Sequence, residues 1–108
     1  MFAANAERVD SLMDAADLKV FATVARIGSM NRAANELHTV QSNVTARVRT
    51  LEEELGVELF HRGRRGVTLT AAGERLLPYA TKVTHLLEEA QKAVKDDGKP
   101  KGRLISAP

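Results

Sequence analysis

The sequence predicts a mainly α-helical protein, built as one small domain followed by a long helix. The chain has 108 residues, the length of a single domain. Only 4% of them are aromatic, which disfavours a β-sandwich or barrel. Apolar residues recur at helical spacing in four stretches. Between residues 59 and 69 this spacing gives way to two short apolar segments around a glycine-containing turn, which is typical of a β-hairpin.

Composition and charge exclude several classes of protein. The chain has no cysteine and three scattered histidines, so neither a disulfide framework nor a thiolate metal site is expected. No apolar run approaches the roughly 20 residues of a membrane span. The N-terminus has no cationic region followed by an apolar one, so it is not a secretory signal. We expect a cytoplasmic protein in which residues 1–12 form a flexible extension.

The first two helices are predicted to be joined tightly. Apolar residues at helical spacing indicate a helix over about 15–27, which Gly28 would end in a left-handed conformation. Ser29 can then cap a second, short helix over about 30–37. This second helix contains two adjacent alanines, which would let two helix backbones approach closely.

The third helix, over about 41–55, carries its large apolar side chains on one line. Opposite this line, its first three turns carry small polar and cationic groups and no acid. Such a helix can pack on its own domain and also lie against polyanionic DNA. An ordinary amphipathic surface helix is the alternative on periodicity alone. The residues of the polar side and its flanks are Gln41, Ser42, Asn43, Thr45, Ala46, Arg47 and Arg49.

The predicted hairpin is cationic. Its turn is Gly63-Arg64-Arg65-Gly66, and glycines at both ends would supply unusual backbone angles. Two adjacent arginines at an exposed tip repel each other unless a polyanion is nearby, although a solvated loop is the simpler alternative. Three helices and a basic hairpin make a winged helix-turn-helix, with the helix-turn-helix itself at about residues 30–49.

The last helix is predicted to start after Thr70 as N-cap and to reach about Val94. Its apolar residues follow a four-three spacing, typical of a helix that pairs with another helix. A domain this small cannot cover the whole seam, so a partner helix is expected. Pro78 should bend the early turns. The seam consists of Leu76, Ala80, Val83, Leu87, Ala90 and Val94.

The stretch from Leu18 to Thr70 resembles the DNA-binding domain of LysR-type transcriptional regulators, and the similarity continues through the long helix. Residues 102–105 are similar to the start of the family's effector domain. So many matches at fixed spacing are more specific than a lone helix-turn-helix pattern. The matching residues are Phe21, Val24, Ala25, Gly28, Ser29, Ala33, Ala34, Leu37, Gln41, Val44, Thr45, Leu51, Glu52, Leu55, Gly56, Leu59, Phe60, Arg62, Leu69, Thr70, Ala72 and Gly73.

Two positions depart from the family pattern. The family usually has Ser where this chain has Val40, and a valine side chain cannot cap a helix. Either Thr39 caps a shifted start of the third helix, or its first amides face a phosphate. At Ala46, many members have a longer polar residue. The gap left there favours apolar contact with a thymine methyl group.

The resemblance implies a bacterial one-component regulator, of which this chain would contain three parts. Residues 13–70 would be the DNA-binding domain, residues 71–97 a dimerising linker helix, and residues 98–108 a linker and the start of an effector domain. A homodimer would bind an inverted-repeat operator in double-stranded DNA, and the full-length protein would form a higher oligomer on the nucleoid. A small-molecule inducer would bind the C-terminal domain, and this chain would need no cofactor.

The residue chemistry agrees with that role. Gln41 and Asn43 offer paired donors and acceptors suited to adenine, and Ser42, Thr45 and Ala46 would also meet base edges. Arg47 and Arg49 would reach phosphate or guanine. Ser29, Asn31 and Arg32, at the start of the second helix, would hold backbone phosphate. The hairpin would follow the flanking backbone or minor groove through Arg62, Arg64 and Arg65.

Two other classes of function fit the sequence less well. For an enzyme or a metal site, His85 and Glu88 lie one helical turn apart, but no second such pair completes a metal site. His38 and His61 lack the serine and carboxylate pattern of a catalytic triad. The second alternative is a winged-helix module that binds only proteins. It predicts an apolar or acidic recognition face on the third helix, whereas Ser42, Thr45 and Arg49 make that face polar and cationic.

Overall fold

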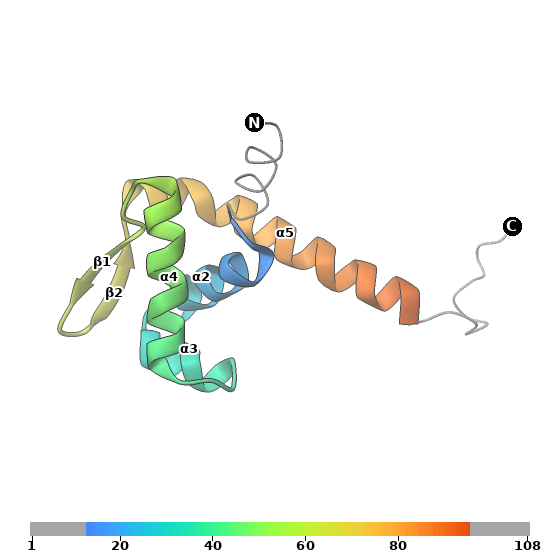
Figure 1. The fold of residues 1–108 in the computed structure, drawn as a ribbon, viewed down its shortest axis with the longest axis horizontal. Helices are drawn as coiled ribbons and strands as arrows, with labels where there is room; N and C mark the ends of the chain where they lie inside the picture. The colour runs from blue at the N-terminus through green and yellow to red at the C-terminus, as the bar shows by residue number, and fades with distance from the viewer. Residues whose placement is uncertain (1–12, 96–108) are drawn as a thin grey trace, which may run out of the picture.

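The computed structural model describes residues 13–95 of the protein. Within this range it contains four helices and a two-stranded antiparallel hairpin, which confirms the predicted winged helix-turn-helix followed by a long helix (Figure 1). The extension predicted for residues 1–12, and the linker and start of an effector domain predicted for residues 98–108, lie outside the described residues. The elements are α2 (Ala15–Ile27), α3 (Met30–Glu36), α4 (Gln41–Leu55), β1 (Phe60–Gly63), β2 (Gly66–Leu69) and α5 (Ala71–Lys95).

The tight junction between α2 and α3 forms as predicted. Gly28 ends α2 in the left-handed region, with φ of 82°, and its amide donates to the carbonyl of Val24 over 2.7 Å. A residue with a side chain would be strained there. Ser29 then caps α3, because its hydroxyl accepts a hydrogen bond from the Arg32 amide over 3.1 Å. The chain therefore turns between two helices in two residues.

The core lies where α2, α3 and α4 converge on the hairpin. Val44, Val48 and Leu51 are completely buried, so the predicted apolar line of α4 faces the domain. Phe21 of α2 and Phe60 of β1 are also buried, and their rings pack at a tilt with centroids 5.3 Å apart. Such an aromatic pair adds to the free energy gained by burying its area. It joins the hairpin to the helical domain and orients both relative to α4.

The hairpin, or wing, pairs Phe60 with Leu69 and ends at the pair Gly63 and Gly66. Gly66 has φ of 129°, and a Cβ atom there would come within 2.3 Å of the Gly28 carbonyl oxygen. This close approach requires glycine. The matching prediction for Gly63 is wrong, because positive φ in this turn is confined to Gly66. The difference arises because one left-handed residue is enough to close this turn while its other end stays extended.

Helix α5 has two different halves. Thr70 caps it, since its hydroxyl accepts from the Gly73 amide over 3.0 Å. The helix continues through Pro78 and runs past α2, so that its second half projects from the domain (Figure 1). Ala80 is completely buried against α2 and its neighbours, whereas Leu87 is 46% exposed. None of the helices in the described part is long and apolar enough to cross a membrane.

Candidate nucleic-acid interface

The first turns of α4 present a polar face to solvent. We use "polar face" for Gln41, Ser42, Thr45, Ala46 and Arg49, which together line an open hollow of about 560 Å³. All are exposed except Thr45, which is half-buried. Ala46, whose side chain is a single methyl group, is the smallest of the residues that line this hollow. Five of the predicted base-contacting or cationic residues are therefore brought together on one surface.

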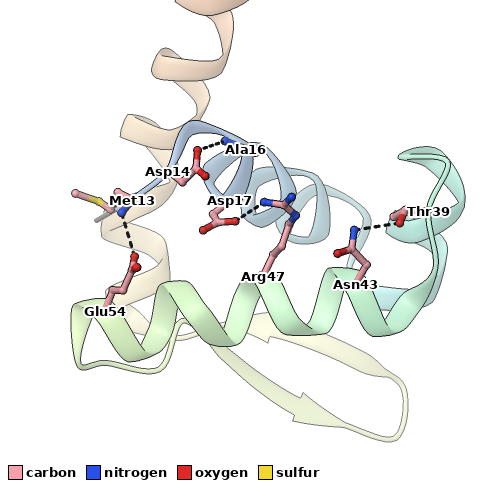
Figure 2. Close-up of polar contacts among 8 residues, drawn as sticks. All are labelled: Met13, Asp14, Ala16, Asp17, Thr39, Asn43, Arg47 and Glu54. Atoms are coloured by element: carbon pink, nitrogen blue, oxygen red, sulfur yellow. Dashed lines mark hydrogen bonds and ion pairs between the residues drawn. The ribbon is translucent and has the colours of Figure 1, made fainter. Parts of the chain in front are cut away.

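The N-terminus of α4 resolves one of the alternatives left open by the sequence. The helix begins at Gln41, its N-cap is Val40, and no side chain in the described residues caps it. The shifted start with Thr39 as cap is wrong, because the Thr39 hydroxyl instead accepts from Asn43 Nδ2 over 3.0 Å (Figure 2). That bond turns Asn43 toward the preceding loop. The first amides of α4 thus have no side-chain cap among the described residues.

Arg47 lies on the edge of α4 that faces α2. Its Nη1 atom is 2.8 Å from Oδ1 of Asp17, an acid in the first turn of α2 (Figure 2). The Asp17 side chain is only 8% exposed, whereas that of Arg47 is 40% exposed. A buried carboxylate is unfavourable unless it is paired, so this ion pair has a role in packing α4 on α2. Arg47 remains within reach of a ligand at the edge of the polar face.

The arginines of the wing fall into two groups. Arg62 points toward α4, where its Nη2 atom is 3.4 Å from Oε1 of Glu52. Glu52 also accepts a hydrogen bond from the Leu59 amide over 2.9 Å, so it fixes the start of the wing. Arg64 and Arg65 lie at the turn and are exposed. Neither is in a salt bridge with another described residue.

The start of α3 is also accessible. Asn31 and Arg32 are exposed, and Ser29, which caps the helix, is half-buried. Ser29 uses its oxygen as an acceptor for the cap, which leaves its hydroxyl proton able to donate. All three side chains lie at the same end of α3, where the helix dipole favours an anion. Their contact with phosphate stays a prediction.

Two structural acids could not be assigned a role from the sequence. Asp17 stands four residues before Phe21, so it interrupts the apolar side of α2, and an acid at such a position signals a buried partner. Glu52 matches the family pattern, but the sequence does not show that it binds both the backbone and the arginine of the wing. Its three hydrogen-bonding partners lie across a turn, which periodicity within one helix does not show.

No cluster of three or more metal-binding side chains occurs among residues 13–95. His85 is exposed on α5, and Glu88 lies one turn further along the same helix. His38 has φ of 59° in the turn before α4, and it is exposed. His61 is exposed on β1. The three histidines thus lie on separate elements.

These features together define a winged-helix domain in which the first turns of α4 present a polar face without acids. The family model described as "Bacterial regulatory helix-turn-helix protein, lysR family" matches residues 15–74. The chain belongs to the LysR family of bacterial regulators, and this segment is its helix-turn-helix DNA-binding domain.

The relatives and structural neighbours of the chain are consistent with membership of this family. The HTH-type transcriptional regulator YofA of Bacillus subtilis strain 168 is 55% identical over 92 residues, which are 85% of this chain and 32% of YofA. The chain thus spans about a third of the length of the curated relatives that it matches.

Two solved structures are complexes with DNA. The DNA-binding domain of CbnR with DNA has a TM-score of 0.71 and 36% identity, and the match covers 81% of this chain and all of that one (100%). The DNA-binding domain of BenM with catB site 1 DNA has a TM-score of 0.74 and 30% identity, over 81% of this chain and 98% of that one.

Proposed function

We propose that this chain binds an inverted-repeat operator in double-stranded DNA as a dimer, with α4 in the major groove and the wing on the flanking backbone or minor groove. The observation that carries the proposal is the polar face of α4, which is accessible, free of acids and backed by a fully buried apolar line. CbnR and BenM, whose DNA-binding domains resemble this chain, were solved with DNA. A helix of this kind has the width to enter the major groove.

Each part of the surface would make a different kind of contact. Gln41, Ser42, Thr45 and Ala46 would meet base edges, and Arg49 would reach guanine or phosphate. Asn43, held by Thr39, would reach the rim of the groove. The backbone would be held by the start of α3, by the first amides of α4 and by the wing. These backbone contacts would come from Ser29, Asn31, Arg32, Arg47, Arg62, Arg64 and Arg65.

Dimerisation would use the second half of α5. Val83, Leu87 and Val94 are 36%, 46% and 74% exposed, and they continue the spacing that Leu76 and Ala80 begin against the domain. With Ala90, they would pack against the same helix of a second copy, antiparallel as in the resembled family. Leu76 and Ala80 pack against the chain's own core, so their part in the seam would be to fix the helix on its domain.

In the longer regulator, a small-molecule inducer would act through a C-terminal domain. The protein would work on nucleoid DNA in the cytoplasm, and the domain boundaries would be those predicted: residues 13–70 for DNA binding, 71–97 for the linker helix and 98–108 leading into the next domain. A winged helix used only for protein association is the alternative. The exposed arginines at the wing tip and the acid-free polar face of α4 favour DNA.

The test is selection of bound fragments from random duplex DNA with the chain as it stands. We expect enrichment of one inverted repeat and, on heparin, retention that falls steeply with salt. A pool that stays random after repeated rounds, together with weak retention on heparin, would favour the association module instead. Enrichment of a single, unrepeated half-site would support DNA binding but contradict binding as a dimer.

A further inference from the structure

A buried acid lies directly behind the DNA-facing edge of α4. Asp17 is 6% exposed as a residue and belongs to the first turn of α2, thirty positions before Arg47. The two side chains reach toward each other across the gap between the helices (Figure 2). Asp17 contributes almost no exposed surface with which to contact a ligand. Asp17 can therefore affect DNA binding only through Arg47, with which it pairs.

Arg47 has hydrogen-bonding capacity beyond this pair. A guanidinium carries five N–H donors in a rigid plane, and the structure engages one of its nitrogens, Nη1, with the carboxylate. The side chain is 40% exposed, so part of that plane faces solvent. Because the carboxylate holds one end of that plane, the remaining donors have fewer directions open to them. Fixing a donor before binding lowers the entropy that is given up when the contact forms.

The residues around Arg47 determine what its free N–H groups can contact. Asn43 lies one turn earlier on the same side of α4 and is itself tied to Thr39. Ala46 precedes Arg47 and leaves the hollow of the polar face open. An arginine that was free to rotate could reach across this hollow. Held by Asp17, it stays at the edge, where the phosphates that border a groove would lie.

We propose that Asp17 is a positioning residue for operator recognition. Its buried carboxylate fixes the Arg47 guanidinium at the edge of the polar face, so that the remaining N–H groups hold one backbone phosphate and set the register of α4 in the groove. This proposal rests on the proposed function. It also has an electrostatic consequence: the carboxylate partly neutralises Arg47, so Arg47 adds direction to binding but little general attraction for DNA.

The experiment compares Asp17→Asn, Arg47→Gln and the double variant with the wild type. Affinities are measured for the selected operator and for a random duplex of equal length. Asparagine has the shape of aspartate without the charge, so Asp17→Asn should lower the ratio of operator to random affinity about tenfold. Affinity for random DNA should stay the same or rise, because a negative charge has been removed. In the Arg47→Gln background, Asp17→Asn should change the ratio less than about twofold.

The matched control is Glu36→Gln, which makes the same change of charge in the exposed ion pair of Arg26 and Glu36. It should leave the ratio unchanged. Circular dichroism melting separates folding from recognition, and a purely structural role for Asp17 would lower the melting temperature while preserving the ratio of the folded protein. That result overturns the proposal, and so does an equal drop in the ratio with and without Arg47. If the wild type shows no operator preference, the proposed function itself fails.

Discussion

The two cationic regions of the domain hold their charges in different ways. In α4, Arg47 is tied 2.8 Å from a carboxylate that the core buries. In the wing, Arg64 and Arg65 stand exposed at a turn with no salt bridge to another described residue. A fixed cation can select one position of a phosphate, whereas a solvated one attracts any phosphate nearby. In the proposed complex, α4 would therefore set sequence and register, whereas the wing would set general affinity and salt dependence.

The largest expected effect comes from an acid on the polar face. Ser42→Glu should abolish detectable preference for the operator, a drop of about 100-fold or more, because it places a negative charge against the groove. Ser42 is exposed and lies opposite the buried line of α4, so helical circular dichroism should be unchanged. Both quantities are measured on one sample.

The control for this variant is His85→Glu, an acid added at an exposed position of α5. It should keep the operator preference. Thr45→Glu should act like Ser42→Glu, although Thr45 is half-buried and some decrease in stability is also expected. If Ser42→Glu keeps the operator preference, the recognition surface lies on another element. The role proposed for α4 would then be wrong.

The next effect concerns the partner helix rather than DNA. Leu87→Glu would bury a charge against an apolar seam, which costs several kcal/mol of association free energy. The variant should sediment as a monomer and bind a full palindrome no better than a half-site, because in the proposed dimer the paired α5 helices would fix the distance between two copies of α4. Lys92→Gln changes the charge by the same amount at an exposed position of α5 and should stay dimeric.

A wild-type chain that remains monomeric at high concentration and on DNA would contradict the dimer. So would a Leu87→Glu variant that keeps the preference for the palindrome. In either case each complex would contain one α4 and one wing instead of two. Their contributions to DNA affinity would then have to be measured on half-sites.

The fold could be predicted closely from local signals. Gly28, Ser29, Thr70 and the apolar line of α4 each act within a few residues, and the helix limits that they predicted agree with the structure. The prediction of an unusual backbone angle at Gly63 was wrong, because the closure of a four-residue turn depends on both strands at once. The pattern of two glycines does not show which one takes the positive φ.

The site could be predicted only in part. The polar face follows from helical periodicity, so its residues could be found from the sequence alone. The pair of Asp17 and Arg47 could not, because thirty residues separate them and the contact exists only after α2 packs on α4. The division of α5 is hidden for the same reason: its spacing is uniform, but from Val83 onward the large apolar residues of the seam are exposed.

Neutralising the wing tip should have a moderate and uniform effect. Arg64→Gln with Arg65→Gln should weaken binding to operator and random DNA alike, by about tenfold at moderate salt, because both side chains would contact phosphates. The slope of log affinity against log salt should become shallower by about 0.9 for each phosphate that the variant no longer neutralises. Weakening confined to the operator would show that these arginines contact bases, and it would reverse the roles given to the wing and α4.

The smallest effect should come from a single methyl group of the DNA. The hollow at Ala46 is large enough to receive the 5-methyl group of thymine, and replacing that thymine by uracil removes only the methyl. Burying one such group is worth about 0.8 kcal/mol, so uracil should weaken binding about fourfold at one position of each half-site. In Ala46→Ser, where a hydroxyl replaces part of the apolar surface, the same uracil should have less effect. Replacing thymine by uracil under the wing should not change the affinity, because contacts to phosphate do not depend on which base is present. If uracil is tolerated at every thymine of the operator, or if its cost persists in Ala46→Ser, the hollow holds no methyl group and the specificity of α4 rests on its hydrogen-bonding side chains alone.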